Sequence, residues 1–193
     1  MIKTSLASLA AVVTLVACKT SGSPAVNPSS ANPAAAPMQV VVPETFSSAT
    51  AILHDASGKQ VGRVTFADSY AGVVVDGTVN DLGLGSHGIH IHAIGKCEPP
   101  FTTAGGHFNP GQRQHGYLNQ HGPHLGDLPN LDTPASSSLH FEALLPNVTL
   151  KGQNALLDAD GSAVVVHAGR DDYKTDPAGN SGGRVACGVI TAN

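Results

Sequence analysis

Hydrophobic residues recur in short runs along the chain from about residue 40, and polar turn residues separate the runs. The runs are rich in Val, Ile and Leu and are bounded by Gly, Asp, Ser and Asn, which is typical of β-strands. We expect strands at 49–54, 61–66, 73–79, 87–92, 139–143, 163–167 and 185–190. Short strands with frequent turns predict an all-β fold, an antiparallel Greek-key barrel or sandwich of about eight strands.

One long stretch breaks this rhythm. Residues 95–134 carry no strand signal, which is unusual inside a compact domain. The stretch contains Cys97 and four of the ten histidines. We therefore expect a long loop that metal and a disulfide hold in place, because strand pairing is not available to it.

The first seventeen residues follow a different pattern. Lys3 precedes an apolar run from Leu9 to Ala17, which is too short for a membrane-spanning helix and is typical of a signal peptide. The segment Leu15-Val16-Ala17-Cys18 resembles the site at which bacterial lipoproteins are cleaved and lipidated on cysteine. We expect residues 1–17 to be removed and Cys18 to carry a lipid. The alternative is an ordinary signal peptide in which this cysteine has no role.

Residues 18–40 are dominated by Ser, Pro, Ala and Asn and show no apolar periodicity. Such a segment cannot bury enough surface to offset its ordering entropy, so we expect a disordered tether before a folded domain at 41–193. A lipid on Cys18 makes a membrane the expected partner and places the domain in the periplasm or cell envelope. Lys19, where inner-membrane lipoproteins carry aspartate, favours the outer membrane.

Composition and charge argue against several classes of protein. Charged residues make up only 12% of the chain, too few for a helical bundle or coiled coil. A net charge of -4 argues against nucleic acid as a partner. Without Cys18, the remaining Cys97 and Cys187 form an even pair in an exported chain, for which a disulfide is the expected state.

Seven of the ten histidines fall between His87 and His124. His90 and His92 end an expected strand, where residues two apart face the same side about 6.5–7 Å from each other. Together with His167, which ends another strand, they form a carboxylate-free group of imidazoles that suits copper. A second group lies in the long loop and suits zinc, because three imidazoles and one carboxylate can form a tetrahedral site. Its members are His107, His115, His124 and Asp127.

These segments carry a resemblance to a known family. They read Gly88-Ile89-His90-Ile91-His92, Gly105-Gly106-His107-Phe108-Asn109-Pro110, His124-Leu125-Gly126-Asp127-Leu128 and Gly182-Gly183-Arg184-Val185-Ala186-Cys187-Gly188-Val189-Ile190. With Cys97, the set resembles the copper/zinc superoxide dismutases over about residues 49–191. The N-terminal pattern indicates one of the exported bacterial members.

The resemblance implies a role for each site residue. The copper ligands are then His90, His92, His107 and His167, and the zinc ligands are His107, His115, His124 and Asp127. His107 bridges both metals, and Asp171 hydrogen-bonds one copper ligand and one zinc ligand. Cys97 and Cys187 form the disulfide. His121, in His121-Gly122-Pro123, is the alternative to His115, but the family's intervals along the chain favour His115.

The implied activity is that of an oxidoreductase that converts superoxide to dioxygen and hydrogen peroxide. The family mechanism is ping-pong: copper cycles between +2 and +1, and His107 delivers a proton. Because the chain is acidic, superoxide needs a local positive field, which Arg184 would supply with help from Lys174. The alternative for Arg184 is a structural bond to loop carbonyls near Cys97.

Two other functions use similar residues. A periplasmic copper or zinc storage protein would need the same ligands but not Arg184 or a bridging histidine. A mononuclear zinc hydrolase would need a motif such as His-Glu-x-x-His, which the sequence lacks. The family includes homodimers and monomers, and the sequence does not choose between them.

Overall fold

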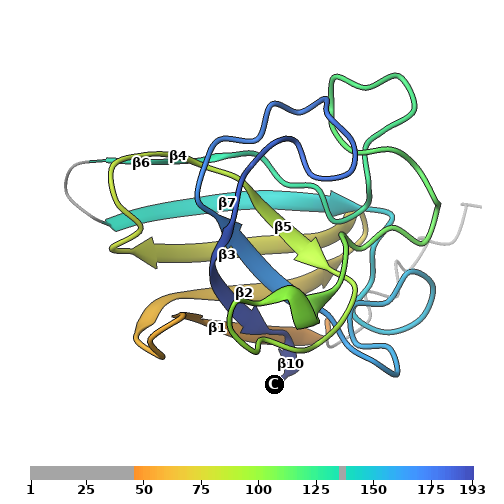
Figure 1. Cartoon of the computed structure of the whole chain (residues 1–193). Coiled ribbons are helices and arrows are strands. Elements are labelled where there is room, and N and C mark those ends of the chain that lie inside the picture. The colour runs from red at the N-terminus through yellow and green to blue at the C-terminus, as the bar shows by residue number, and fades with distance from the viewer. Residues whose placement is uncertain (1–45, 135–137) are drawn as a thin grey trace, which may run out of the picture. The chain divides into compact units, whose positions relative to one another are not determined.

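The computed structural model describes residues 46–134 and 138–193, all within one compact unit that spans Val42–Asn193 (Figure 1). The predicted signal peptide, Cys18 and the tether lie outside the described residues. Within the two described ranges, no helix is long and apolar enough to cross a membrane.

The described residues form ten strands and one short 3-10 helix. The strands are β1 (Ser48–Asp55), β2 (Gln60–Ser69), β3 (Gly72–Asn80), β4 (Gly85–His87), β5 (Ile89–His92), β6 (Leu131–Thr133), β7 (Ser138–Pro146), β8 (Ala163–His167), β9 (Arg184–Val189) and β10 (Thr191–Ala192). The helix is η1 (Thr102–Ala104). Eight strands make one antiparallel sheet in the order β5-β8-β9-β1-β2-β3-β7, with β10 beside β1, and β4 pairs with β6.

The all-β, antiparallel fold class predicted from the sequence is confirmed. The large sheet curls around its core, and β1 lies beside β9 while β3 lies beside β7, so strands distant in sequence become neighbours (Figure 1). The expectation of no strand in 95–134 was wrong at its end, where β6 pairs with β4. With three residues, β6 is too short to show an alternation of hydrophobic and polar positions.

Alternation along β2 and β3 explains the main core. Val64 and Phe66 on β2, and Val73 and Val75 on β3, are buried, whereas the intervening Val74 is exposed. Successive side chains of a strand point to opposite faces, so one face of each strand fills the interior. Each buried side chain of this size contributes about 1.5–3 kcal/mol to folding.

Two strands are buried on both faces, and this positions the site. On β5, Ile89 and Ile91 enter the main core, which leaves His90 and His92 on the opposite face. The neighbouring β8 also places Val164 and Val166 in the main core, and His167 ends the strand. The histidines are therefore fixed by the packing of the aliphatic residues beside them.

The disulfide predicted from the sequence is present. Cys97 and Cys187 are bonded across a separation of 90 residues. They belong to a small second core with Phe101, Ala104 and Val165. The bond ties the start of the long loop to β9, and a closed loop of this length stabilises the fold by about 4–5 kcal/mol in the chain-entropy model.

Candidate metal centre

Four imidazoles converge beside β5 and β8. His90 and His92 come from β5 and His167 from β8, which pair antiparallel, and a bridge between His92 and His107 brings in the long loop. Their ligand nitrogens all lie within 4.8 Å of one another. We call His90, His92, His107 and His167 the strand cluster.

Each ring of the strand cluster has one nitrogen that is held and one that is free. His92 Nδ1 donates to Gly105 O at 2.9 Å, and His167 Nδ1 donates to Gly182 O at 3.2 Å. Among the described residues, the buried side-chain atoms without a hydrogen-bond partner include His90 Nδ1, His92 Nε2, His107 Nε2 and His167 Nε2. Buried polar atoms are nearly always satisfied, so these four convergent nitrogens fit the donor set of a metal ion.

The protonation states of the strand cluster favour metal binding. Burial lowers the pKa of His90 to about 3, that of His92 to about 2 and that of His167 to about 4. Burial also lowers the pKa of His107. The rings are neutral near pH 7 and offer lone pairs rather than N–H groups, as a metal ligand must.

A second group gathers around one carboxylate of the long loop. Asp127 Oδ1 lies 2.9 Å from His107 Nδ1, 3.0 Å from His115 Nδ1 and 3.3 Å from His124 Nδ1. His107 Nδ1 and His124 Nδ1 are 3.3 Å apart. A tetrahedral zinc ion with bonds of about 2.0–2.1 Å has ligands about 3.3 Å apart, so these four atoms are close to that arrangement. We call His107, His115, His124 and Asp127 the loop cluster.

Two histidines compete for the fourth position of the loop cluster, His90 and His124. By distance alone, His90 also groups with His107, His115 and Asp127. However, His90 Nε2 donates to Asp171 Oδ2 at 2.7 Å, and its free Nδ1 is the nitrogen already counted in the strand cluster. His124 is the better fourth ligand because its Nδ1 lies next to both His107 and Asp127.

The loop cluster differs electrostatically from the strand cluster. Burial raises the pKa of Asp127, but its hydrogen bonds to His107, His115 and His124 outweigh burial and hold it well below the usual range. Burial lowers the pKa of His115, but its bonds to Asp127 and Asp171 prevail and raise it to about 9. A metal ion bound by the loop cluster would therefore compete with a proton on His115.

Asp171 connects the two clusters. Its Oδ2 accepts from His90 Nε2 at 2.7 Å, and its Oδ1 accepts from His115 Nε2 at 2.9 Å. The side chain is fully buried. Gly179 lies against this carboxylate with φ of +64°, and a Cβ there would overlap Asp171 Oδ1. Only glycine allows the chain to pass so close at that backbone conformation.

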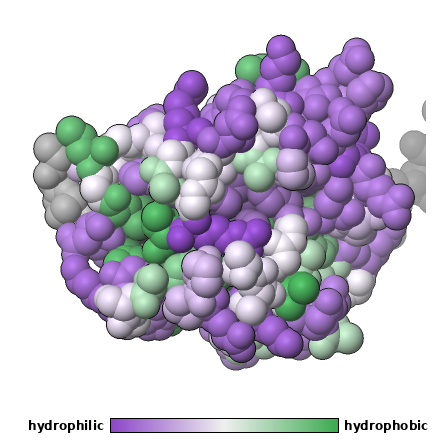
Figure 2. Space-filling view, viewed as in Figure 1, coloured by the Kyte–Doolittle hydropathy of each residue, from purple (hydrophilic) through white to green (hydrophobic). Residues whose placement is uncertain are grey.

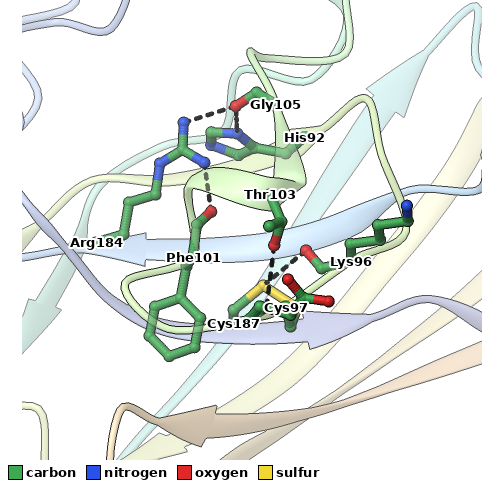
Figure 3. Close-up of a disulfide and its surroundings, with 9 residues drawn as sticks. His92, Lys96, Cys97, Phe101, Thr103, Gly105, Arg184 and Cys187 are labelled. Atoms are coloured by element: carbon green, nitrogen blue, oxygen red, sulfur yellow. Dashed lines mark hydrogen bonds between the residues drawn. A yellow bond between two sulfur atoms is a disulfide. The ribbon is translucent and has the colours of Figure 1, made fainter.

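A cavity of about 350 Å³ opens beside the strand cluster. Its lining includes His92, His107, His167, Arg113, Asp176 and Arg184. Figure 3 shows the Arg184 guanidinium between the carbonyls of Phe101 and Gly105: Nη1 donates to Phe101 O and Nη2 to Gly105 O, both at 2.6 Å. Burial lowers the pKa of Arg184, but a guanidinium remains charged near neutral pH. A fixed positive charge therefore faces the cavity.

Not every candidate from the sequence lies at the site. His115 is fully buried in the loop cluster, whereas His121 is exposed and its ring bonds to Gln120. Lys174 is exposed and does not line the cavity. His87 belongs to neither cluster, and its Nδ1 donates to His167 O at 2.9 Å.

Two charged residues of the cavity, Arg113 and Asp176, were not predicted from the sequence. Arg113 stands two residues before His115, and its Nε donates to Gly122 O at 3.0 Å. Asp176 Oδ1 accepts from the backbone N–H of His115 at 2.6 Å. Proximity to His115 in the sequence was a usable signal for Arg113. Asp176 had none, since it is 61 residues from His115.

A curled antiparallel sheet that carries an all-imidazole cluster and a three-histidine, one-aspartate cluster with a shared histidine defines a candidate dinuclear metal protein. A family model described as copper/zinc superoxide dismutase matches residues 60–190. Superoxide dismutase [Cu-Zn] 1 of Aquifex aeolicus (strain VF5) is 44% identical over 137 residues, or 69% of this chain and 81% of that protein.

Solved structures agree. A SOD-like protein from Bacillus subtilis has a TM-score of 0.71 and 38% identity, covering 74% of this chain and 97% of that chain. The Cu/Zn superoxide dismutase from Brucella abortus has a TM-score of 0.61 and 30% identity, covering 75% and 99%. The chain belongs to the copper/zinc superoxide dismutase family. The predicted family, its oxidoreductase activity on superoxide, and copper and zinc as cofactors are thereby confirmed.

Proposed function

We propose that the strand cluster holds copper, that the loop cluster holds zinc, and that His107 is the ligand they share. The observation that carries this assignment is the set of four buried ring nitrogens without partners in the strand cluster. An all-imidazole set suits a redox-active copper ion, and three imidazoles with one carboxylate suit zinc. His107 can serve both because its Nδ1 faces the loop cluster and its Nε2 belongs to the strand cluster.

The overall reaction takes two superoxide anions and two protons to one dioxygen and one hydrogen peroxide. Copper supplies the change between +2 and +1 that both half-reactions need, and zinc supplies a fixed positive charge. Of the residues in the chain, His107 is placed to move a proton. Its Nδ1 is engaged beside Asp127, so Nε2 is the atom that takes up a proton and hands it to the product at the cavity.

Arg184 attracts and docks the anion. The chain is acidic overall, so diffusion toward the cavity depends on local positive charge. The two bonds to Phe101 O and Gly105 O match the structural alternative considered from the sequence. These bonds also hold the guanidinium at the cavity wall, so the structural and steering roles belong to the same arrangement.

We also propose that the mature protein is exported and lipid-anchored, with residues 1–17 as signal peptide, Cys18 as the lipidated residue, 18–40 as tether and 41–193 as the catalytic domain. The outer membrane is the proposed site of the anchor. The disulfide supports export, because such bonds persist in oxidising compartments. Mass spectrometry of the protein from a native bacterial host tests this: a diacylated N-terminus at Cys18 supports it, and an intact Lys3 in the mature protein contradicts it.

Dismutation activity and metal content, measured on one preparation, test the assignment. We expect one copper and one zinc per chain and activity that is lost when copper is removed. His115→Ala should release zinc, and the matched control His121→Ala should keep both metals and full activity. A storage protein would bind the metals without dismutation, and that result would overturn the proposed function.

A further inference from the structure

One asparagine holds both backbone polar groups of Asp171. Asn130 Nδ2 donates to Asp171 O at 2.9 Å, and the Asp171 N–H donates to Asn130 Oδ1 at 2.8 Å. A single carboxamide thus pairs with one residue as a neighbouring strand would. The side chain of Asp171 is held as well, by His90 at Oδ2 and by His115 and the Tyr173 N–H at Oδ1.

Asn130 is itself held in place by its neighbours in the core and by a backbone hydrogen bond. It lies between Leu128 and Leu131, which are 1% and 2% exposed and belong to the main core. Its own backbone N–H donates to the Tyr173 hydroxyl at 2.6 Å. The side chain that grips Asp171 is therefore anchored to the barrel and to the loop that contains Asp171.

Tyr173, which bonds Asn130, also contacts the long loop. Its carbonyl accepts from the Leu118 N–H at 2.9 Å, and its ring lies 5.5 Å from that of Tyr117. Gly116 packs on the Tyr173 carbonyl so closely that a Cβ there would overlap it. The segment 171–173 is consequently fixed against both the core and the long loop.

We propose that Asn130, with the Tyr173 hydroxyl, is a positioning residue that sets the Asp171 carboxylate so that it can bond His90 and His115 together. This inference rests on the proposed function in one respect, the assignment of His90 to copper and His115 to zinc. Asp171 must reach two rings at 2.7 and 2.9 Å from a single carboxylate, which leaves little room for its backbone to shift. Loss of the Asn130 side chain frees both backbone groups of Asp171 and allows that shift.

The test compares Asn130→Ala and Tyr173→Phe with the matched control Asn119→Ala. Asn119 also joins the two loops, through Nδ2 to Lys174 O at 3.4 Å, but it touches no polar atom of Asp171. The readouts are zinc affinity, by competition with a chromophoric chelator, and the electron paramagnetic resonance spectrum of bound Cu(II). Substitution of a residue that hydrogen-bonds a metal ligand typically lowers metal affinity by about 10–100-fold. We expect about a tenfold loss of zinc affinity and a shifted copper spectrum for both variants, and wild-type values for Asn119→Ala.

If the variants lower the melting temperature while zinc affinity and the copper spectrum stay at wild-type values, Asn130 is only structural and the proposal is wrong. Tyr173→Phe removes one oxygen atom and keeps the test open if Asn130→Ala does not fold. Neither readout depends on turnover. A wild-type protein that binds both metals without dismutation would therefore refute the proposed function and leave this inference to be judged separately.

Discussion

The strand cluster and the loop cluster share His107 but are built from different contacts. In the strand cluster, aliphatic neighbours buried in the core fix the β5 and β8 histidines, and burial keeps their rings neutral. In the loop cluster, one carboxylate gathers three imidazoles and two backbone N–H groups, those of Gly116 and His124. Figure 2 shows that hydrophilic residues predominate on the surface of the loops at the top of this view.

The strand cluster is therefore positioned by the packing of the fold. The loop cluster depends on polar contacts and on bound metal. Packing of Ile89 and Ile91 in the core places His90 and His92 on the opposite face of β5. The loop cluster depends on Asp127, on Asp171 and on the disulfide, because its chain segment contains only short regular elements.

His107→Ala should damage both clusters, because it removes the shared ligand. We expect affinity for copper and for zinc each to fall by more than about 100-fold, beyond the usual effect of an outer-shell residue. Dismutation should be lost with them. Metal analysis after dialysis against a chelator measures this, and retention of one tightly bound copper and one tightly bound zinc would show that His107 is not the bridge.

Cys97→Ser should weaken the attachment of the loop to the barrel. Removal of a native disulfide typically costs about 2–5 kcal/mol, so the melting temperature should fall clearly. The loop cluster should lose zinc before the strand cluster loses copper on warming. Thermal melts with metal release recorded in parallel check this, and a free Cys97 thiol in the oxidised wild-type protein would remove the basis for the claim.

Asp127→Ala and His167→Ala form a pair that separates the clusters. Asp127→Ala should lower zinc affinity by more than about 100-fold, because a zinc ligand is lost, and copper affinity by about tenfold, the low end of the effect of losing a partner of a metal ligand. His167→Ala should do the reverse. Equal losses of both metals in both variants would mean that the two clusters are one cooperative unit.

Arg184→Ala should keep both metals and lower activity by about tenfold, at the small end of the effect of electrostatic steering on association rates. The wild-type rate should fall with rising ionic strength, because screening acts over about 8–10 Å near physiological salt, and the variant should show a flatter dependence. Arg184→Lys should recover part of the loss. Release of copper from Arg184→Ala would assign the residue a purely structural role.

The strand cluster was more predictable from the sequence than the residues that hold and surround the metal site. A period of two places His90 and His92 on one face of a strand, and that follows from local pattern alone. The zinc-type residues could be grouped because their residue types form a known ligand set. Asn130 gave no signal, because it meets Asp171 across 41 residues through a polar contact that no periodicity encodes. Asp176 likewise gave no signal, because it is 61 residues from His115 and reaches the cavity only through the folded loops.

We propose that two metals share His107 in two chemically distinct sites. Anomalous diffraction from crystals of the protein loaded with both metals, recorded at the copper and zinc absorption edges, tests it directly. We predict a copper peak bounded by His90, His92, His107 and His167, and a zinc peak bounded by His107, His115, His124 and Asp127. A zinc peak in the strand cluster of the fully loaded protein would contradict this assignment. So would a His107 ring that contacts only one metal when copper is in the +2 state.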